Sequence, residues 1–153
     1  MSHTETACLK RMQRMVYDWQ FYLCLLLGPL FWLGLTFFMP TQARDFTAQI
    51  DLVRWLMLII LYPVLEEFVF RGLVLEWLHK RLARRRLGLL SLANLLTSVL
   101  FVAVHFIAQP WYWALLVFFP SLVFGYMKER HNSLISPIIL HSTYNLGFIF
   151  LFV

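Results

Sequence analysis

Glu66, Glu67 and Arg71 interrupt an apolar segment, YPVLEEFVFRGLVLEWL, at residues 62–78. A charged side chain at the centre of a bilayer costs roughly 2.5–3.5 kcal/mol on insertion scales, so such residues usually mark function. Glu67 and Arg71 are four residues apart, so they share a helical face and can pair. Glu66 points about 100° away from Glu67 and can face another group. We interpret the segment as part of a functional site. A structural ion pair with a spare carboxylate is the alternative.

A second group lies in the apolar segment that follows. Ser91, Asn94, Ser98, Phe101 and His105 recur at steps of three and four, so they share one face of a helix. A single membrane histidine can simply hydrogen-bond a neighbouring helix. A polar stripe that leads to a histidine favours a hydrated groove instead.

A third group is HSTYN near the C-terminal end of the sequence. His141 and Asn145 are four residues apart and stack on one helical face. Asn145 can orient the His141 imidazole or donate a hydrogen bond to an oxyanion. Earlier in the same segment, Ser136 and Pro137 are typical of a helix N-cap followed by the first helical residue.

The three groups together supply two Glu, two His, one Arg and one Asn from three helices. Glu and His on facing helices can hold a metal ion. They can also polarise a water for attack on a carbonyl. The sequence contains no Gly-x-Ser-x-Gly elbow, no His-Glu-x-x-His and no phosphate-binding loop, so those mechanisms find no support.

The elements that must position these side chains are membrane helices. Of the 153 residues, 61% are hydrophobic and 14% are charged, which leaves too little polar surface for a soluble domain of this size. We predict an all-α, polytopic membrane helix bundle, because five apolar segments approach the roughly 20 residues that cross a bilayer. The predicted spans are residues 21–39, 52–78, 87–107, 111–127 and 134–153. Residues 1–20 would be a basic cytoplasmic tail and residues 21–153 a single transmembrane core.

Lysine and arginine set the expected orientation. The formal charge is +5, and the positive residues cluster in the tail, at 80–86 and at 128–130. Loops rich in lysine and arginine alternate with loops that have few of them, which predicts a cytoplasmic N-terminus and an external C-terminus. We interpret this pattern as membrane orientation, with no nucleic acid as partner. The first span is too long for a signal peptide, and Cys8 and Cys24 are not expected to form a disulfide.

In this order, the three groups resemble the motifs of the CAAX-protease and bacteriocin-processing (CPBP, also called Abi) family of intramembrane endopeptidases. EEFVFR matches Glu-Glu-x-x-x-Arg, FVAVH matches Phe-x-x-x-His, and HSTYN matches His-x-x-x-Asn/Asp. The resemblance covers residues 62–145. It implies a helical membrane fold that encloses the site, and it implies hydrolysis of a peptide bond in or near the membrane. In its short length the chain resembles stand-alone bacterial members linked to protein sorting, which remove a C-terminal membrane anchor.

The resemblance also implies roles for the site residues. Glu66 would be the base that activates water, with Glu67 and Arg71 as its support. The histidines of the second and third motifs would polarise the water or the scissile carbonyl. Asn145 would help to stabilise the oxyanion.

Family members have been described both as metalloproteases and as metal-independent glutamate-type proteases. We favour the glutamate type without a cofactor, because Glu and His supply a base and an electrophile. In the metal-dependent alternative, Glu66, His105 and His141 would hold zinc. The expected partners are a membrane protein or lipidated peptide as substrate and the lipid bilayer, with a bacterial inner membrane as the location. A second copy or a partner membrane protein can cover the lipid-facing sides of so small a core.

The predicted spans place the two histidines at different depths. At 1.5 Å per residue, His105 lies about 25 Å from the start of its span and His141 about 10 Å from the start of the fifth. Residues that share one water cannot be so far apart. We therefore predict that the fifth helix is short or begins late, at Pro137, and that the third begins nearer Ser91.

Two other classes of function use the same residues. Buried Glu and His also form relays, so a transporter or proton relay is the first alternative, although five spans without an internal repeat weigh against it. The second is a non-catalytic membrane partner or immunity factor, which would tolerate the loss of both histidines. The protease interpretation is preferred.

Overall fold

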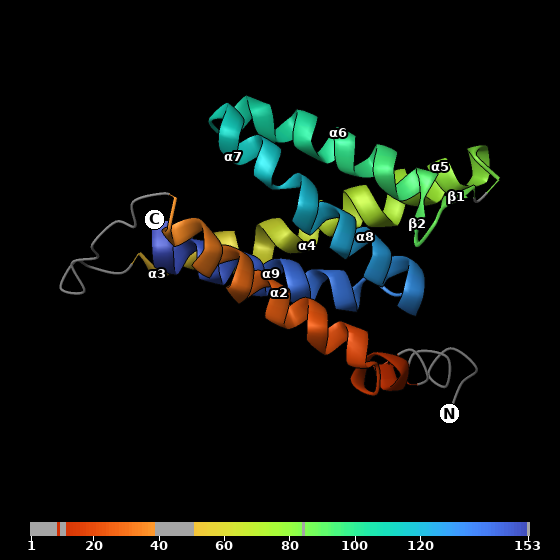
Figure 1. Cartoon of the computed structure of the whole chain (residues 1–153), viewed down its shortest axis with the longest axis horizontal. Coiled ribbons are helices and arrows are strands. Elements are labelled where there is room, and N and C mark those ends of the chain that lie inside the picture. The colour runs from red at the N-terminus through yellow and green to blue at the C-terminus, as the bar shows by residue number, and fades with distance from the viewer. Residues whose placement is uncertain (1–8, 10–11, 39–50, 84, 153) are drawn as a thin grey trace.

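The computed structural model describes residues 9, 12–38, 51–83 and 85–152 of the chain. Almost all of them are helical, which confirms the all-α prediction. Each predicted apolar segment overlaps with one helix or with a run of helices (Figure 1). In chain order these are α2 (Trp19–Thr36), a continuous run from Leu52 to Arg81, α6 (Leu92–Ala108), α7 (Trp111–Leu116) followed by α8 (Phe118–His131), and α9 (Ile135–Phe152).

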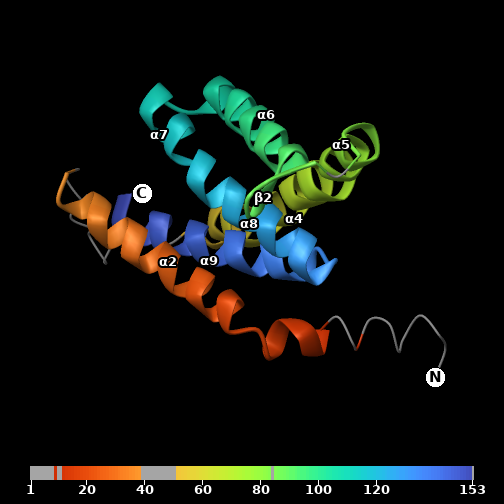
Figure 2. The same cartoon turned by 45° about the vertical axis from the view of Figure 1, so that its right-hand side comes forward.

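α9 lies at the centre of the bundle. It packs along α2 on one side and along α8 on the other, and α8 in turn packs against α6 (Figure 2). The α2–α9 contact is close because Gly28 has no side chain and the Tyr144 ring occupies that space, where a Cβ would lie 2.5 Å from the ring. The apolar core of this contact is formed by Met15, Phe21, Cys24, Phe124, Met127, Leu140 and Tyr144. Met15 belongs to the predicted tail, so part of that tail packs on the bundle.

The run from Leu52 to Arg81 contains two π-helical segments between α-helical ones. It consists of α3 (Leu52–Leu56), η1 (Met57–Leu61), α4 (Tyr62–Glu67), η2 (Phe68–Val74) and α5 (Leu75–Arg81), where η1 and η2 are π-helical. Segments of π-helix are often found at functional sites. Here η1 and η2 flank α4, the element that carries both glutamates of the site.

The first π segment and Pro63 together leave the Leu58 carbonyl without a hydrogen bond from the two residues that follow the segment. The Tyr62 N–H donates to Met57 O, and Pro63 has no N–H, so neither residue donates to Leu58 O. The Leu58 carbonyl, in a partly buried residue, therefore needs a partner from elsewhere. The Asn145 side chain of α9 supplies it, with Nδ2 2.9 Å from Leu58 O. This bond ties α9 to η1.

The third predicted span begins later than residue 87. β1 (Arg86–Leu87) and β2 (Leu90–Ser91) form an antiparallel hairpin, and Gly88 at its turn has φ of 64°, which a glycine adopts without strain. Ser91 then caps α6 by accepting a hydrogen bond from Asn94 N at 2.9 Å. The predicted start nearer Ser91 is confirmed.

The prediction of a short or late fifth helix is wrong. α9 begins at Ile135 and has 18 residues. The physical reason lies in the turn before it, where Asn132 adopts the left-handed conformation (φ 48°), which Asn tolerates, and reverses the chain at once. Ser133 Oγ accepts from Ile135 N, so Ser136 is not the N-cap. It lies in the first turn instead, 3.4 Å from Met127 O.

Asp18 joins the start of α2 to the end of α8 through contacts with Arg130 and His131, here called the Asp18 latch. Asp18 caps α2 by accepting from Gln20 N at 3.1 Å, and the same carboxylate binds Arg130 and, at 2.9 Å, His131 Nε2. The hydrogen bond from Arg130 is the largest cause that lowers the pKa of Asp18, to about 2. The carboxylate is therefore charged in the folded protein far into the acid range.

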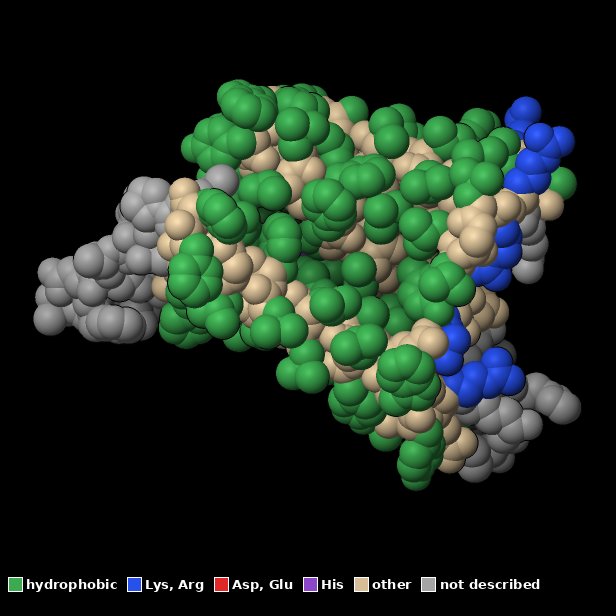
Figure 3. All heavy atoms as spheres, in the orientation of Figure 1, with side chains coloured by type: hydrophobic (Ala, Val, Ile, Leu, Met, Phe, Trp, Pro, Cys, Tyr) green, Lys and Arg blue, Asp and Glu red, His purple; other side chains and the backbone are tan. Residues whose placement is uncertain are grey.

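Charge and hydrophobicity are separated on the surface. Lysine and arginine side chains gather at one end of the molecule, and the rest of the face in Figure 3 is largely hydrophobic. That end is where α5 and α8 finish and where α2 and α9 begin (Figure 1). Within the described residues, Trp19–Thr36 is the one helix that is both long and apolar enough to cross a membrane, whereas Leu92–Ala108 and Ile135–Leu151 are shorter apolar helices.

Candidate active site

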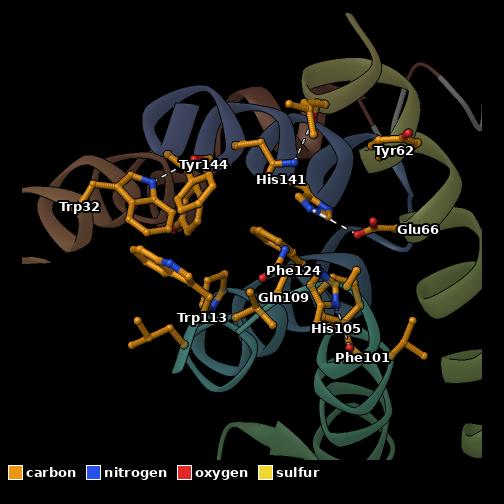
Figure 4. Close-up of a pocket in the computed structure, with 18 residues that line it drawn as sticks. Trp32, Tyr62, Glu66, Phe101, His105, Gln109, Trp113, Phe124, His141 and Tyr144 are labelled. Carbon is orange, nitrogen blue, oxygen red and sulfur yellow. Dashed lines mark hydrogen bonds and ion pairs between the residues drawn. The ribbon is translucent and has the colours of Figure 1, made fainter. Parts of the chain in front are cut away.

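A cavity of about 460 Å³ lies between the helices and receives side chains from α2, η1, α4, α6, α7, α8 and α9. Four of the predicted site residues line it, namely Glu66, His105, His141 and Asn145. Figure 4 shows Glu66 and the two histidines toward one end of this cavity. The structure thus brings together residues from all three sequence motifs.

Glu67 and Arg71 lie behind the cavity wall and are fully buried. Arg71 Nη1 donates to Glu67 Oε1 at 3.0 Å, so the pairing predicted from their spacing is confirmed. Arg71 Nη2 donates to Ser121 of α8, at 2.9 Å to its carbonyl and 2.7 Å to its hydroxyl. The guanidinium also lies over the Phe101 ring, 4.7 Å from its centroid. The pair is therefore enclosed by hydrogen bonds and aromatic rings.

His141 connects this buried pair to the cavity. Its Nδ1 lies 2.8 Å from Glu67 Oε1. A carboxylate only accepts, so Nδ1 carries the hydrogen and donates a hydrogen bond to Glu67. This leaves Nε2 toward Glu66, whose Oε2 is 3.6 Å away. Phe124 stacks on the imidazole with ring centroids 4.9 Å apart and holds the ring plane.

The distance between Glu66 and His141 suits a shared water. A separation of 3.6 Å is too long for a direct hydrogen bond, and a water that lies to one side of both atoms, in the cavity, can bind the two together. The Glu66 side chain keeps 32% of its surface exposed, whereas Glu67 has none. Of the two adjacent glutamates, only Glu66 can therefore meet a water in the cavity.

His105 is held by its own helix. Its Nδ1 lies 2.9 Å from Phe101 O, which can only accept, so Nδ1 is the protonated nitrogen and Nε2 is left for the cavity. The Phe101 ring contacts both histidines, with centroid distances of 4.3 Å to His105 and 6.0 Å to His141. The two imidazoles therefore lie near one another despite the depths inferred from the predicted spans.

The predicted hydrated groove along α6 is wrong for the first three residues of the stripe. Ser91, Asn94 and Ser98 are buried and do not line the cavity. Asn94 Nδ2 donates to Leu122 O at 2.9 Å, and its side chain fills the space where Gly125 lacks a Cβ. These residues bind α6 to α8, and the stripe meets the cavity only at Phe101 and His105.

Two residues of the site were not identified from the sequence. Ser121 binds Arg71, and Phe124 stacks on His141. Both come from α8, which carries no Asp, Glu, Lys, Arg or His in its first ten positions and matched no motif. A serine inside an apolar segment was the only available signal.

The metal-dependent alternative requires three ligands that converge on one point. Within the part of the chain that the structure describes, no three His, Cys, Asp or Glu side chains are grouped so that they could hold a metal ion. Glu66, His105 and His141 line one cavity without forming such a group.

The structure thus combines an almost all-helical fold and a largely hydrophobic surface with a glutamate and two histidines around an internal cavity. The family model for type II CAAX prenyl endopeptidase Rce1-like proteins matches residues 48–147, which is 100 of the 153 residues. The chain belongs to this family of integral membrane CAAX-type endopeptidases. No curated protein and no solved structure matches it.

Proposed function

We propose that the chain is a glutamate-type intramembrane endopeptidase in which Glu66 activates the attacking water. The observation that carries this proposal is the 3.6 Å gap between Glu66 Oε2 and His141 Nε2 on the wall of the cavity. A water in the cavity beside these two atoms would bind Glu66, an acceptor that can take its proton. It would also lie beside an imidazole whose orientation is fixed from behind by Glu67.

The reaction follows from these positions. Glu66 removes a proton from the water as its oxygen attacks the scissile carbonyl carbon. The carbonyl oxygen becomes an oxyanion, which His105 stabilises with a proton on Nε2 when its ring is cationic. The carbon–nitrogen bond then breaks, and the proton held by Glu66 passes to the leaving amine. One water is consumed, one carboxylic acid and one amine are formed, and Glu66 returns to its carboxylate form.

Asn145 can add a second oxyanion donor. An amide NH₂ has two hydrogens, and the bond to Leu58 O uses one of them. The same bond fixes the side chain at the cavity wall, so that a donor is preorganised there at no further cost in side-chain entropy. In this proposal Asn145 has both a structural and a catalytic task.

We place the protein in a bacterial inner membrane with five crossings. The gathering of lysine and arginine at the end where α2 and α9 begin supports a cytoplasmic N-terminus. The run Leu52–Arg81 and the pair α7–α8 would each form one crossing. An alkaline phosphatase fused to the C-terminus should be active, because this enzyme folds outside the cytoplasm. An inactive but stably expressed fusion would contradict the topology.

The proposed substrate is a membrane-anchored segment, such as a C-terminal anchor or sorting peptide. The purified full chain in phospholipid nanodiscs should convert some members of a panel of tail-anchored peptides to products with one new carboxyl terminus, identified by mass spectrometry. Glu66→Gln should form no product. Glu76→Gln is the matched control on the same helical run, because Glu76 pairs with Lys128 away from the cavity. Equal product from Glu66→Gln and wild type would reject the proposal.

A further inference from the structure

A second pocket lies between the β1–β2 hairpin and the last two turns of α8. It has a volume of about 480 Å³ and is lined by Arg86, Gly88, Leu89, Tyr126, Glu129 and Arg130. This lining shares no residue with the cavity that holds Glu66, so the proposed reaction does not use the pocket. Two of its lining residues are arginines from different elements, and paired guanidinium groups are well suited to a phosphate.

The two arginines are held in place and keep donors for a ligand. Arg86 Nη2 donates to Leu89 O at 2.8 Å, which holds its guanidinium at the turn of the hairpin. Arg130 Nε and Nη2 donate to the Asp18 carboxylate, and 38% of the Arg130 side chain remains exposed. A guanidinium has five N–H donors, so each arginine has hydrogens left for a phosphate oxygen.

Glu129 is the acidic residue of the lining, and it is already hydrogen-bonded. Ser91 Oγ donates to Glu129 Oε1, and His79 Nε2 lies 3.1 Å from the same oxygen. A carboxylate only accepts, so both partners donate. These bonds join the hairpin and α5 to α8 and fix both walls of the pocket. They also satisfy the glutamate, which leaves the arginines as the groups that select a ligand.

The pocket lies where the charged end of the molecule meets its hydrophobic surface (Figures 1 and 3). Among the described residues of this end, basic side chains outnumber acidic ones: Lys80, Arg81, Arg85, Arg86, Lys128 and Arg130 against Asp18, Glu76 and Glu129. Trp19 and Trp77 are exposed near the same end, and tryptophan is enriched at the headgroup level of a bilayer. In an integral membrane protein these features place the pocket among lipid headgroups.

The tip of the hairpin adds an apolar surface to the arginines. Leu87 and Leu89 are 62% and 76% exposed, and Leu89 lines the pocket. Contact with an acyl chain would remove these side chains from water. A free phosphate has no apolar part to place there, so the combination of arginines and leucines favours a lipid.

We propose that this pocket, here called the headgroup site, binds the phosphate of an anionic phospholipid such as phosphatidylglycerol through Arg86 and Arg130. The acyl chains of the lipid lie against Leu87 and Leu89. Basic pockets between membrane helices commonly bind anionic headgroups. The bound lipid connects the hairpin before α6 to the end of α8. This inference uses the membrane placement of the chain and does not depend on its peptidase activity.

Lipid titration followed by native mass spectrometry tests the headgroup site. The purified full chain in a neutral detergent receives phosphatidylglycerol or phosphatidylcholine, and the bound fraction is measured at each concentration. Wild type should bind one phosphatidylglycerol about tenfold or more tightly than phosphatidylcholine. Arg86→Gln should weaken this binding about tenfold, the effect of losing a charge-assisted hydrogen bond. Arg85→Gln is the matched control, because Arg85 is exposed and lies outside the lining, and it should change the affinity less than about twofold. Equal losses in the two variants would overturn the site.

Cross-linking of the wild-type chain gives a test that needs no variant to fold. Phosphatidylglycerol with a diazirine in its headgroup is incorporated into nanodiscs with the protein, irradiated and mapped by mass spectrometry. The label should appear at residues 86–89 and 126–130, and equimolar glycerol 3-phosphate, which lacks acyl chains, should not reduce it. Labelling confined to other segments would overturn the site. Loss of the label with glycerol 3-phosphate would overturn the lipid as its ligand and indicate a soluble phosphate ester.

Discussion

Replacing Arg71 by methionine should be among the most damaging single changes to this fold. Arg71 and Glu67 are both fully buried, and Arg71 makes three hydrogen bonds, one to Glu67 and two to Ser121. Methionine fills a similar volume but leaves the Glu67 carboxylate without its cation. Removing one partner of a buried ion pair typically costs about 3–5 kcal/mol. We expect a loss of that size in the free energy of unfolding.

The assay is unfolding by sodium dodecyl sulfate in mixed micelles, followed by far-UV circular dichroism. Arg85→Met is the matched control, because Arg85 is exposed, and it should change the free energy of unfolding by less than about 0.5 kcal/mol. Glu67→Gln combined with Arg71→Met should recover part of the loss, because the uncompensated charge is gone. A loss below about 1 kcal/mol for Arg71→Met, or strict additivity of the two changes, would refute the reasoning.

Two further predictions follow from other contacts. Gly125→Ala places a Cβ 1.9 Å from Asn94 Oδ1 and should lower the free energy of unfolding by about 1–3 kcal/mol in thermal unfolding, a loss that Asn94→Ala should partly recover. Gly34→Ala is the control, because nothing lies within 4 Å of its added Cβ. Equal melting temperatures for Gly125→Ala and Gly34→Ala would contradict this packing. For the Asp18 latch, the folded pKa of about 2 lies below the ordinary value of 3.8, so its stabilisation is complete above about pH 5 and is lost as the pH falls through 3.8 toward 2. Asp18→Asn should flatten this part of the stability profile, whereas Asp51→Asn should not; an unchanged slope in Asp18→Asn would show that other groups cause it.

The ionisable residues of the site could be predicted because their signals are local. Glu67 and Arg71 pair as their spacing of four dictates, and Glu66 is left on another face. The orientation of His141 was harder. Asn145, four residues later, was a candidate for orienting the imidazole, but His141 Nδ1 bonds instead to Glu67, which lies on a different helix. Such a contact depends on how α4 and α9 pack, which spacing within one helix cannot reveal.

The polar stripe of α6 shows why the same pattern can have two meanings. Small polar residues at helical spacing can line water or can bind another helix. The distinction depends on the facing helix, and here Gly125 of α8 provides the space that Asn94 fills. The hairpin before α6 was missed for a related reason. Its leucines extended the apolar segment, and Gly88 was the only sign of a turn.

The central claim is that Glu66 activates water beside His141 without a metal ion. The most direct measurement is the rate of product formation by the purified chain on a cleaved membrane peptide, with and without a zinc chelator, for wild type and Glu66→Gln. The account predicts that the wild-type rate is unchanged by the chelator and that Glu66→Gln forms no product under either condition. Loss of wild-type activity with the chelator and its return on adding zinc would contradict it.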